Sequence, residues 1–480
     1  MVIVLCLALG VIFNEGGVAN MPVSTLIPHF EEDFENSSLL PVKSTPTAVE
    51  TAIQELRAEG IGKIPDYFSS LFLIVLTDIA CFTESDYELT QFAVAIGLPA
   101  YCDRFREEFI RLFKSDASYS VFFVLCKESF DLEVRASVVR KRLAIGLDNF
   151  TFITVNRSNL FETSLSALLS RESYGRLLHV SFIGESAVGY GVSREWVSAL
   201  AVEIFATSGL FSQRLTGDLE DRKYSVYVGG ATGEQMRAIG RFLAFCVFYD
   251  LPIGVQLPIY YYYKLFKLDV DLAAIASDEP ALFNSYSYLL GATEAELNES
   301  YEISSTVVTI ENRERLIAQA LNDLIPSQNV ARIDEMLNGF KQFISLYDMK
   351  RLFGPKHLQK LIYGEIDISI GDLANNWICD LDWPTHGTSQ CTWLLEILES
   401  FDMKRRGYFL RFVTGRSKLP IGGFRVLDPL IRVTFSNQVD TLPQSQTCFN
   451  MLWVSKYSSK DLMKEKLKWA IEGGLDHLED

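Results

Sequence analysis

The sequence is poor in the residues from which metal centres and disulfide frameworks are built. Its 480 residues include eight cysteines, none in a CxxC pair, and five histidines whose positions match no metal-ligand spacing. The chain is also far larger than a typical disulfide-stabilised domain. We therefore expect no metal and no cofactor. We also expect reduced thiols, as in the cytoplasm, with the nucleus left open as the other compartment.

Clusters of basic residues, glycine-rich phosphate loops and membrane-length apolar runs are also missing. The net charge is −17, and Lys and Arg form no cluster large enough to bind nucleic acid. The apolar opening from Met1 to Phe13 has no positive charge before it and is too short to cross a bilayer. We interpret it as a buried helix or strand, and we predict no nucleic-acid partner and no membrane span.

What the sequence does contain is typical of a folded globular protein. Hydrophobic residues make up 48% and charged residues 22% of the chain, and its length allows roughly two to four domains. The sequence pattern of residues 1–148 predicts mostly helix, and the capping-box pattern from Thr47 to Glu50 predicts where one of these helices begins. Nothing in this region indicates chemistry, so its role stays open.

The pattern changes to a mixture of strands and helices over residues 149–372. The segments FTFITVNR and LLHVSFIG are rich in β-branched and aromatic residues and predict strands. Helices are expected from Ser193 and from near Glu234, which predicts a helix-rich α+β domain. The run from Tyr260 to Tyr263 winds around a further helix, so we expect at most half of its rings to be buried.

Residues 373–384, LANNWICDLDWP, show no apolar periodicity, and we interpret them as a linker. Residues 385–480 predict a compact mixed domain. An apolar stripe from Trp393 to Phe401 indicates one helix, Asp402 caps the next, and Ser458 or Ser459 begins the last. Between these helices, LIRVTF and CFNMLWV predict strands.

The segment LPQSQTCFNMLWVSKYSSK contains the most specific pattern in the chain. Its Thr-Cys-Phe-Asn core follows Leu-Pro and precedes Tyr-Ser-Ser-Lys, and further blocks upstream are FIGESAVGYGVSREW, AIGRFLAFCVFYDLPIGVQLP and TIENRERL. Together, in this order, the blocks resemble the HECT family of ubiquitin ligases over residues 150–480. The resemblance implies a bilobal α+β fold that follows the helical region 1–148. Its parts are a larger helix-rich N-lobe (149–372), a hinge (373–384) and a smaller mixed C-lobe (385–480).

The resemblance also assigns a chemical role to Cys448. In this family a conjugating enzyme passes ubiquitin to the ligase cysteine as a thioester, and a lysine of a protein substrate then attacks that thioester. The resemblance therefore implies ubiquitin, a conjugating enzyme and a protein substrate as partners. It implies supporting roles near the thiol for Gln446, Thr447, Asn450 and His477.

Three positions depart from the family pattern. Gln446 stands where the family has histidine, and a glutamine can form hydrogen bonds but cannot act as a base. His477 stands where the family has phenylalanine, and Gly189 where it has an acidic residue. These departures bear on lysine attack more than on loading of the thiol. Because no Lys, Arg or His lies between Asn437 and Ser455, we expect any activating charge to come from another segment or a partner.

A second set of positions matches the apolar groove in which the family's conjugating enzyme docks. These positions are Leu282, Ser285, Tyr286, Leu289 and Leu316. The same side chains would equally serve as helix core, and the sequence leaves both roles open. Two other functions also stay open. One is a HECT-like scaffold that binds a conjugating enzyme without efficient transfer, and the other is an unrelated thiol hydrolase, for which no histidine lies near Cys448 in the sequence.

Overall fold

The computed structural model places mainly the second part of the chain. The described residues are 106, 110, 129–144, 147, 150–170, 175–187, 189–214, 223–226, 230–297, 301–365, 367–380 and 387–473. The chain divides into two compact units, residues 1–142 and 143–480. The first unit is described mainly by α9 (Leu132–Leu143), and the opening apolar segment and the predicted capping box at Thr47 lie outside the described residues. None of the helices in these ranges is long and apolar enough to span a membrane.

The second unit begins with a larger lobe, which is rich in helix. Its helices are α10 (Leu160–Leu169), α11 (Tyr190–Val202), α12 (Gly233–Phe248), α13 (Ile259–Phe266), α14 (Pro280–Gly291), α15 (Glu294–Leu297), α16 (Arg313–Asn322), α17 (Ser327–Lys341), α18 (Leu346–Leu352) and α19 (Pro355–Tyr363). Short helical turns are η5 (Arg157–Asn159), the π-helical η6 (Glu203–Thr207) and η7 (Leu272–Ile275). Its strands are β1 (Phe150–Val155), β2 (Leu177–Phe182), β3 (Phe211–Arg214), β4 (Lys223–Val226), β5 (Glu302–Ile303) and β6 (Thr306–Val307).

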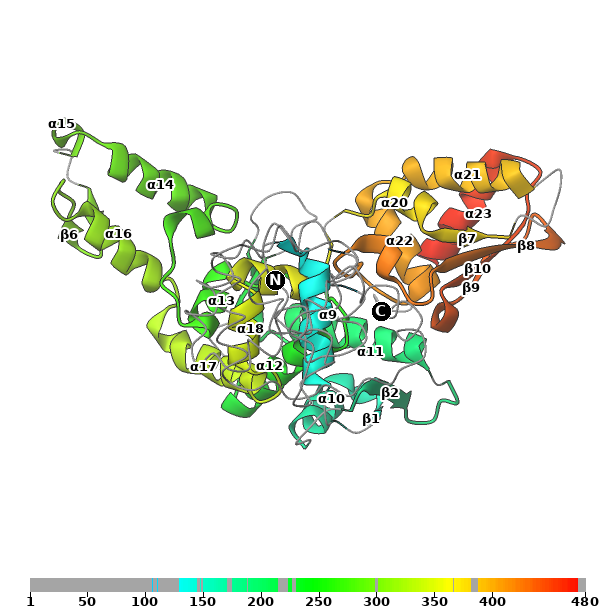
Figure 1. The fold of residues 1–480 in the computed structure, drawn as a ribbon, viewed down its shortest axis with the longest axis horizontal. Coiled ribbons are helices and arrows are strands. Elements are labelled where there is room, and N and C mark those ends of the chain that lie inside the picture. The colour runs from blue at the N-terminus through cyan, green and yellow to red at the C-terminus, as the bar shows by residue number, and fades with distance from the viewer. Residues whose placement is uncertain are drawn as a thin grey trace, which may run out of the picture. The chain divides into compact units, whose positions relative to one another are not determined.

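The strands of the larger lobe form two-stranded sheets. β1 and β2 pair in parallel, which confirms both strands predicted from the sequence, and β3–β4 and β5–β6 are antiparallel pairs. Alternate residues of β1 and β2 are buried against α10 and α11, because successive side chains of a strand point to opposite faces. Figure 1 shows α14 and α16 side by side, with α15 and β6 at their far ends.

The core of the larger lobe is built on the close approach of α12 and α17. α12 begins at a capping box, in which the side chains of Thr232 and Gln235 accept each other's backbone N–H groups. A Cβ atom on Gly240 would clash with the carbonyl oxygen of Met336, and one on Gly339 would clash with that of Arg237. The two helix backbones therefore touch where glycine removes the side chain.

The expectation for the tyrosine run was wrong. All four rings of α13 are buried, since Tyr260, Tyr261 and Tyr262 are each 4% exposed and Tyr263 is 9% exposed. α13 packs against α19 and η7, so its surface is covered from several sides and not along one stripe. The Tyr263 hydroxyl donates to the Asp271 carboxylate at 3.0 Å, which satisfies its polar group at the edge of the core.

The second unit ends with a smaller lobe of mixed structure. Its helical elements are α20 (Ile370–Asn375), α21 (Gly387–Glu399), α22 (Met403–Thr414), η8 (Gly423–Val426), η9 (Thr447–Phe449) and α23 (Lys460–Glu472). Its strands are β7 (Trp377–Cys379), β8 (Ile431–Val439), β9 (Gln444–Gln446) and β10 (Met451–Lys456). They form one sheet in the order β7-β8-β10-β9, in which only β9 runs antiparallel to its neighbour. The two lobes together confirm the predicted bilobal α+β fold.

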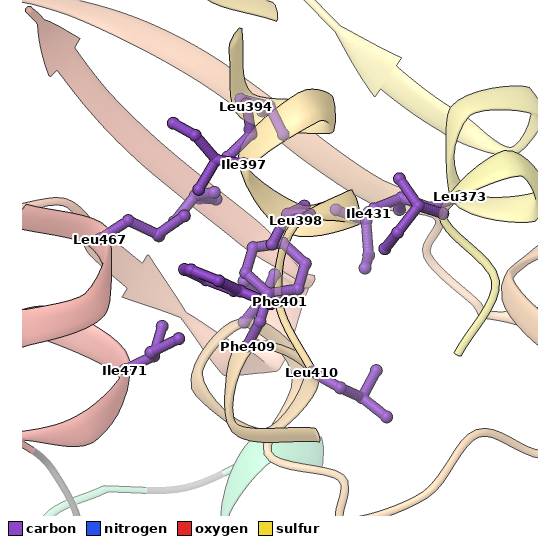
Figure 2. Close-up of a cluster of buried hydrophobic side chains, with 14 of the residues drawn as sticks. Leu373, Leu394, Ile397, Leu398, Phe401, Phe409, Leu410, Ile431, Leu467 and Ile471 are labelled. Atoms are coloured by element: carbon purple, nitrogen blue, oxygen red, sulfur yellow. The ribbon is translucent and has the colours of Figure 1, made fainter. Parts of the chain in front are cut away.

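The apolar stripe predicted on α21 is the centre of the smaller lobe. Leu394, Ile397 and Leu398 are fully buried and meet Phe409 of α22 and Leu467 of α23 (Figure 2). The predicted caps are also confirmed. The side chain of Asp402 accepts from the N–H group of Arg405 at the start of α22, and that of Ser459 accepts from Leu462 at the start of α23.

The prediction of a linker over residues 373–384 is wrong for residues 373–380. Leu373 lies on α20 and is fully buried in the core of the smaller lobe, and β7 pairs with β8 at the edge of its sheet. The core already includes Ile368, so the smaller lobe begins there and not at residue 385. α20 and β7 are too short to produce a periodic apolar pattern, which is why the sequence did not show them. Residues 381–384 lie outside the described residues.

Among the cysteines that the structure describes, the prediction of reduced thiols is wrong for one pair. The sulfur atoms of Cys379, on β7, and Cys391, on α21, are joined in a disulfide. The pairing arises because both α21 and β7 are part of the smaller lobe, and nothing in the spacing of 12 residues indicates it. Cys246 and Cys448 remain thiols.

Candidate active site

Cys448 lies on a tight turn between two antiparallel strands. β9 and β10 pair through Gln446 and Met451, and η9, which carries Cys448, connects them. Asn450 closes the turn with φ at +51°, a left-handed conformation that asparagine tolerates better than most residues. The thiol is partly exposed at the end of the sheet.

Asn450 fixes the shape of this turn through its hydrogen bonds. Its side chain is fully buried, and its amide nitrogen donates to the carbonyl oxygen of Pro429. Its own carbonyl oxygen accepts from the N–H group of Arg432 on β8 at 2.9 Å. Buried polar groups are normally paired in this way, so Asn450 ties the turn to the neighbouring strand.

A buried arginine of the larger lobe is the main contact of this turn. Nη1 of Arg194 donates to Asn450 Oδ1 at 2.6 Å, to the carbonyl oxygen of Thr447 at 3.1 Å and to that of Thr414 at 3.2 Å. Nη2 donates to the carbonyl oxygen of Asp428 at 3.4 Å. One side chain of the larger lobe therefore joins three segments of the smaller lobe.

Arg194 carries its charge in a place with little water. It is 5% exposed, and burial lowers the pKa of its guanidinium to about 9, with the neighbouring Arg416 acting in the same direction. At pH 7 the group stays protonated, so all its N–H groups remain donors. Sequence reasoning missed Arg194, because a charged residue on a helix normally faces solvent. Its place in the block GVSREW is the only signal that was available.

The start of α11 lies against the thiol. A Cβ atom on Gly189 would lie 3.4 Å from Cys448 Sγ, and one on Gly191 would lie 2.9 Å from it. The Cβ atom on Gly191 would in addition clash with the Thr447 hydroxyl. The position at which the family carries an acidic residue, Gly189, is therefore part of the site, and here it presents no side chain to Cys448.

Gln446 and His477 are the remaining residues for which a supporting role was predicted. Gln446 is exposed at the end of β9, and the structure gives it a place in the strand ladder but no contact that shows a role. Phe449, next to the thiol, is 55% exposed. His477 lies outside the described residues.

Comparison with known proteins identifies the family to which this chain belongs. The model of the HECT-domain (ubiquitin-transferase) family matches residues 199–479, which is more than half of the chain. This chain belongs to the HECT family. Residues 199–479 include the smaller lobe with its Cys448 turn and the larger lobe from the end of α11 onward, whereas β1, β2, α10 and most of α11 precede the matched range.

Several proteins named E3 ubiquitin-protein ligase are similar to this HECT chain. They include Smurf1 of Drosophila melanogaster, 26% identical over 360 residues, HACE1 of Mus musculus, 25% identical over 355 residues, and pub3 of Schizosaccharomyces pombe, 25% identical over 353 residues. Each match covers 67% of this chain but only 33%, 38% and 44% of the respective relative. The chain thus spans less than half the length of these curated relatives.

The five positions matched to the HECT docking groove divide into two groups. Leu289 on α14 and Leu316 on α16 are buried, at 6% and 5% exposed, and the two helices pack against each other. Leu282 and Tyr286 are half-buried and Ser285 is exposed, so these three remain accessible to a partner. Partial burial raises the pKa of Tyr286. Docking itself stays a prediction.

Within the described ranges, no group of three or more His, Cys, Asp or Glu side chains is arranged to hold a metal ion. The groups that the described residues bring together at this HECT site are a thiol, hydrogen-bond donors and a buried guanidinium. These groups suit the transfer of an acyl group between nucleophiles.

Proposed function

We propose that this chain is a ubiquitin-protein transferase that carries ubiquitin as a thioester on Cys448. The observation that carries the proposal is the position of this thiol. It is partly exposed on a turn whose shape is fixed by Asn450 and whose other side meets the start of α11. A thiol that must react with two large partners in turn needs both accessibility and a defined orientation.

The chemistry consists of two exchanges at one carbonyl carbon. In the first, the Cys448 thiolate attacks the thioester carbonyl at the C-terminus of ubiquitin, and the thiolate of the conjugating enzyme leaves. In the second, the amine of a substrate lysine attacks the same carbon, the Cys448 thiolate leaves, and the amine loses a proton as the amide forms. Each step replaces one bond to the carbonyl carbon with another and needs no external oxidant or cofactor.

The other described thiol does not suit this role. Cys246 lies within α12 and is 1% exposed, and burial raises its pKa well above the usual value for cysteine. The reactive thiolate form is therefore suppressed, and neither partner can reach the sulfur atom. Cys246 thus provides a matched control for Cys448.

The partners follow from the same proposal. They are ubiquitin, a conjugating enzyme that docks on the accessible face of α14 formed by Leu282, Ser285 and Tyr286, and a protein substrate that offers a lysine. The cytoplasm, with the nucleus as the other compartment, is the setting that we propose for the reaction.

The test is a loading assay on the whole chain with labelled ubiquitin, activating enzyme and conjugating enzyme. Wild type and Cys246→Ala should form a ubiquitin adduct that a thiol reductant removes. Cys448→Ala should form none, and Cys448→Ser should form an oxygen ester that resists the reductant. Equal labelling of wild type and Cys448→Ala would contradict the proposal.

A further inference from the structure

We propose that Arg194 is a positioning residue for the second step, in which lysine attacks the Cys448 thioester. The inference rests on the function proposed above and assigns a task to a residue that does not itself touch the reacting carbon. The guanidinium holds the turn that carries Cys448 against the start of α11. In that arrangement the thioester has one orientation toward the incoming amine.

Arg194 projects from a helix that is fixed in the larger lobe. Trp196, two residues along α11, is fully buried and packs edge-on against the rings of Phe242 and Phe245. Its Nε1 atom donates to Ser164 Oγ at 2.9 Å. Because α11 is anchored in this way, the guanidinium is presented from a rigid support, as a precise positioning group requires.

The guanidinium holds both sides of the Cys448 turn. It donates to the carbonyl oxygen of Thr447, the residue before the thiol, and to the side chain of Asn450, two residues after it. Both bonds come from Nη1, while Nη2 of the same planar group donates to the carbonyl oxygen of Asp428, so two nitrogen atoms at a fixed angle hold the turn and a second segment together. A lysine ammonium is a point charge on a flexible stem and cannot hold the same set of acceptors in one geometry.

These contacts exist only while the smaller lobe is docked on α11. In Figure 1 the α14–α16 pair lies well apart from the β8–β10 sheet that carries the Cys448 turn. A thiol that takes ubiquitin from a conjugating enzyme seated on α14 must therefore leave α11, and with it Arg194. Loading proceeds with the Arg194 contacts broken, so the residue acts in the later step.

The docked arrangement leaves room for the second step. Cys448 keeps part of its surface exposed, and Phe449 beside it is 55% exposed. The contact therefore orients the thiol without covering it. This distinguishes a positioning contact from one that shields the nucleophile.

A second arginine provides the matched control. Arg416 lies in the smaller lobe and donates through Nη1 to the carbonyl oxygen of Asp250 in the larger lobe at 2.8 Å. It therefore also joins the two lobes, but its hydrogen bond ends on a carbonyl far in sequence from the Cys448 turn. Loss of Arg416 weakens the docking of the lobes, whereas loss of Arg194 also releases the turn.

The experiment separates loading from discharge in the whole chain. Wild type, Arg194→Lys and Arg416→Ala are loaded with labelled ubiquitin, the supply is stopped, and free lysine is added over a range of concentrations. We expect all three to load within about twofold of one another. Discharge from Arg194→Lys should be slower by roughly ten- to a hundredfold at saturating lysine, as for a misplaced reacting group. The lysine concentration for half-maximal rate should not change.

Arg416→Ala should discharge within about threefold of wild type. Discharge from Arg194→Lys at the wild-type rate overturns the inference, and so does a loss in loading that matches the loss in discharge. Failure of wild type to load, or equal loading of Cys448→Ala, contradicts the proposed function instead.

If Arg194→Lys does not fold, as judged by loss of a cooperative thermal transition, Gly191→Ala decides the matter. This variant keeps the buried charge and pushes the Cys448 turn away from α11, because its Cβ atom would lie 2.9 Å from the sulfur. It should load normally and discharge slowly. Normal discharge from Gly191→Ala overturns the inference.

Discussion

Nη1 of Arg194 donates a hydrogen bond of 2.6 Å to Oδ1 of Asn450 across the two lobes of the second unit. The amide nitrogen of the same Asn450 side chain donates to the carbonyl oxygen of Pro429. Both polar atoms of the buried Asn450 amide are thus paired. The oxygen accepts a hydrogen bond from the larger lobe, and the nitrogen donates one within the smaller lobe. The turn that carries Cys448 therefore depends on the docking of the lobes for part of its hydrogen bonding.

Two substitutions of Asn450 should distinguish the contribution of its hydrogen bonds to stability from that of its backbone conformation. Asn450→Gly keeps the left-handed φ but leaves its buried partners unpaired, which costs about 1–3 kcal/mol of stability. Asn450→Ala loses the same bonds and adds backbone strain of about 1 kcal/mol at the positive φ. Urea unfolding followed by tryptophan fluorescence measures this, since five of the six tryptophans lie between residues 377 and 469. Equal stability of Asn450→Ala and wild type would contradict the assignment.

Gly191→Ala should expose the Cys448 thiol to reagents. Because the added Cβ atom conflicts with the Cys448 sulfur and the Thr447 hydroxyl, the turn must move away from α11. Alkylation of Cys448 by a maleimide, followed by mass spectrometry of its peptide, should be several times faster than in wild type. Gly407→Ala is the control, because nothing lies within 4 Å of its added Cβ atom, and it should leave the rate unchanged. An unchanged rate in Gly191→Ala would show that the turn does not rest on α11.

Gly240→Ala should strongly destabilise the larger lobe. Its Cβ atom would meet the carbonyl oxygen of Met336 on α17, and neither helix backbone can yield without repacking the core. Overpacking of this kind costs about 1–3 kcal/mol or more. Gly233→Ala, at the start of the same helix, makes only an ordinary contact of 3.6 Å with Glu335 and should change stability little. Thermal melting of the two variants compares them, and similar midpoints would argue against a backbone contact between α12 and α17.

Two tyrosines of α14 should differ in their effect on the conjugating enzyme. Tyr286 lies on the accessible face with Leu282 and Ser285, whereas Tyr288 is 47% exposed and packs 5.8 Å from the ring of Tyr301. Tyr286→Ala should weaken binding by about 1–2 kcal/mol, as for an interface hot spot, and Tyr288→Ala by less than twofold. Titration calorimetry with a conjugating enzyme provides the measurement. A larger loss from Tyr288→Ala would place the docking surface on the other face of the helix.

The sequence predicted those features that depend on local pattern. The strands β1 and β2, the apolar stripe of α21 and the cap at Asp402 each follow from periodicity or from a side chain next to its partner. Cys448 was recognised by its neighbours in the sequence. It occupies a turn between two strands, as a reactive and accessible residue can.

The features that were missed depend on contacts between distant segments. Leu373 was assigned to a linker because α20 is a single short helix whose burial comes from other elements of the smaller lobe. Cys379 and Cys391 become neighbours only once the lobe has formed. Arg194 bonds with residues more than 200 positions away, and no local pattern distinguishes such an arginine from one in solvent.

Three of the four hydrogen bonds from Arg194 end on main-chain carbonyl oxygens, those of Thr414, Asp428 and Thr447. Every residue supplies such an oxygen, so the side chains at these positions can change in evolution without removing the acceptor. The contact between the lobes thus depends on Arg194 in the larger lobe and on the main-chain conformation of the smaller lobe. Related chains that keep it would be recognised by an arginine at this place on α11, even where the sequences of their smaller lobes have diverged.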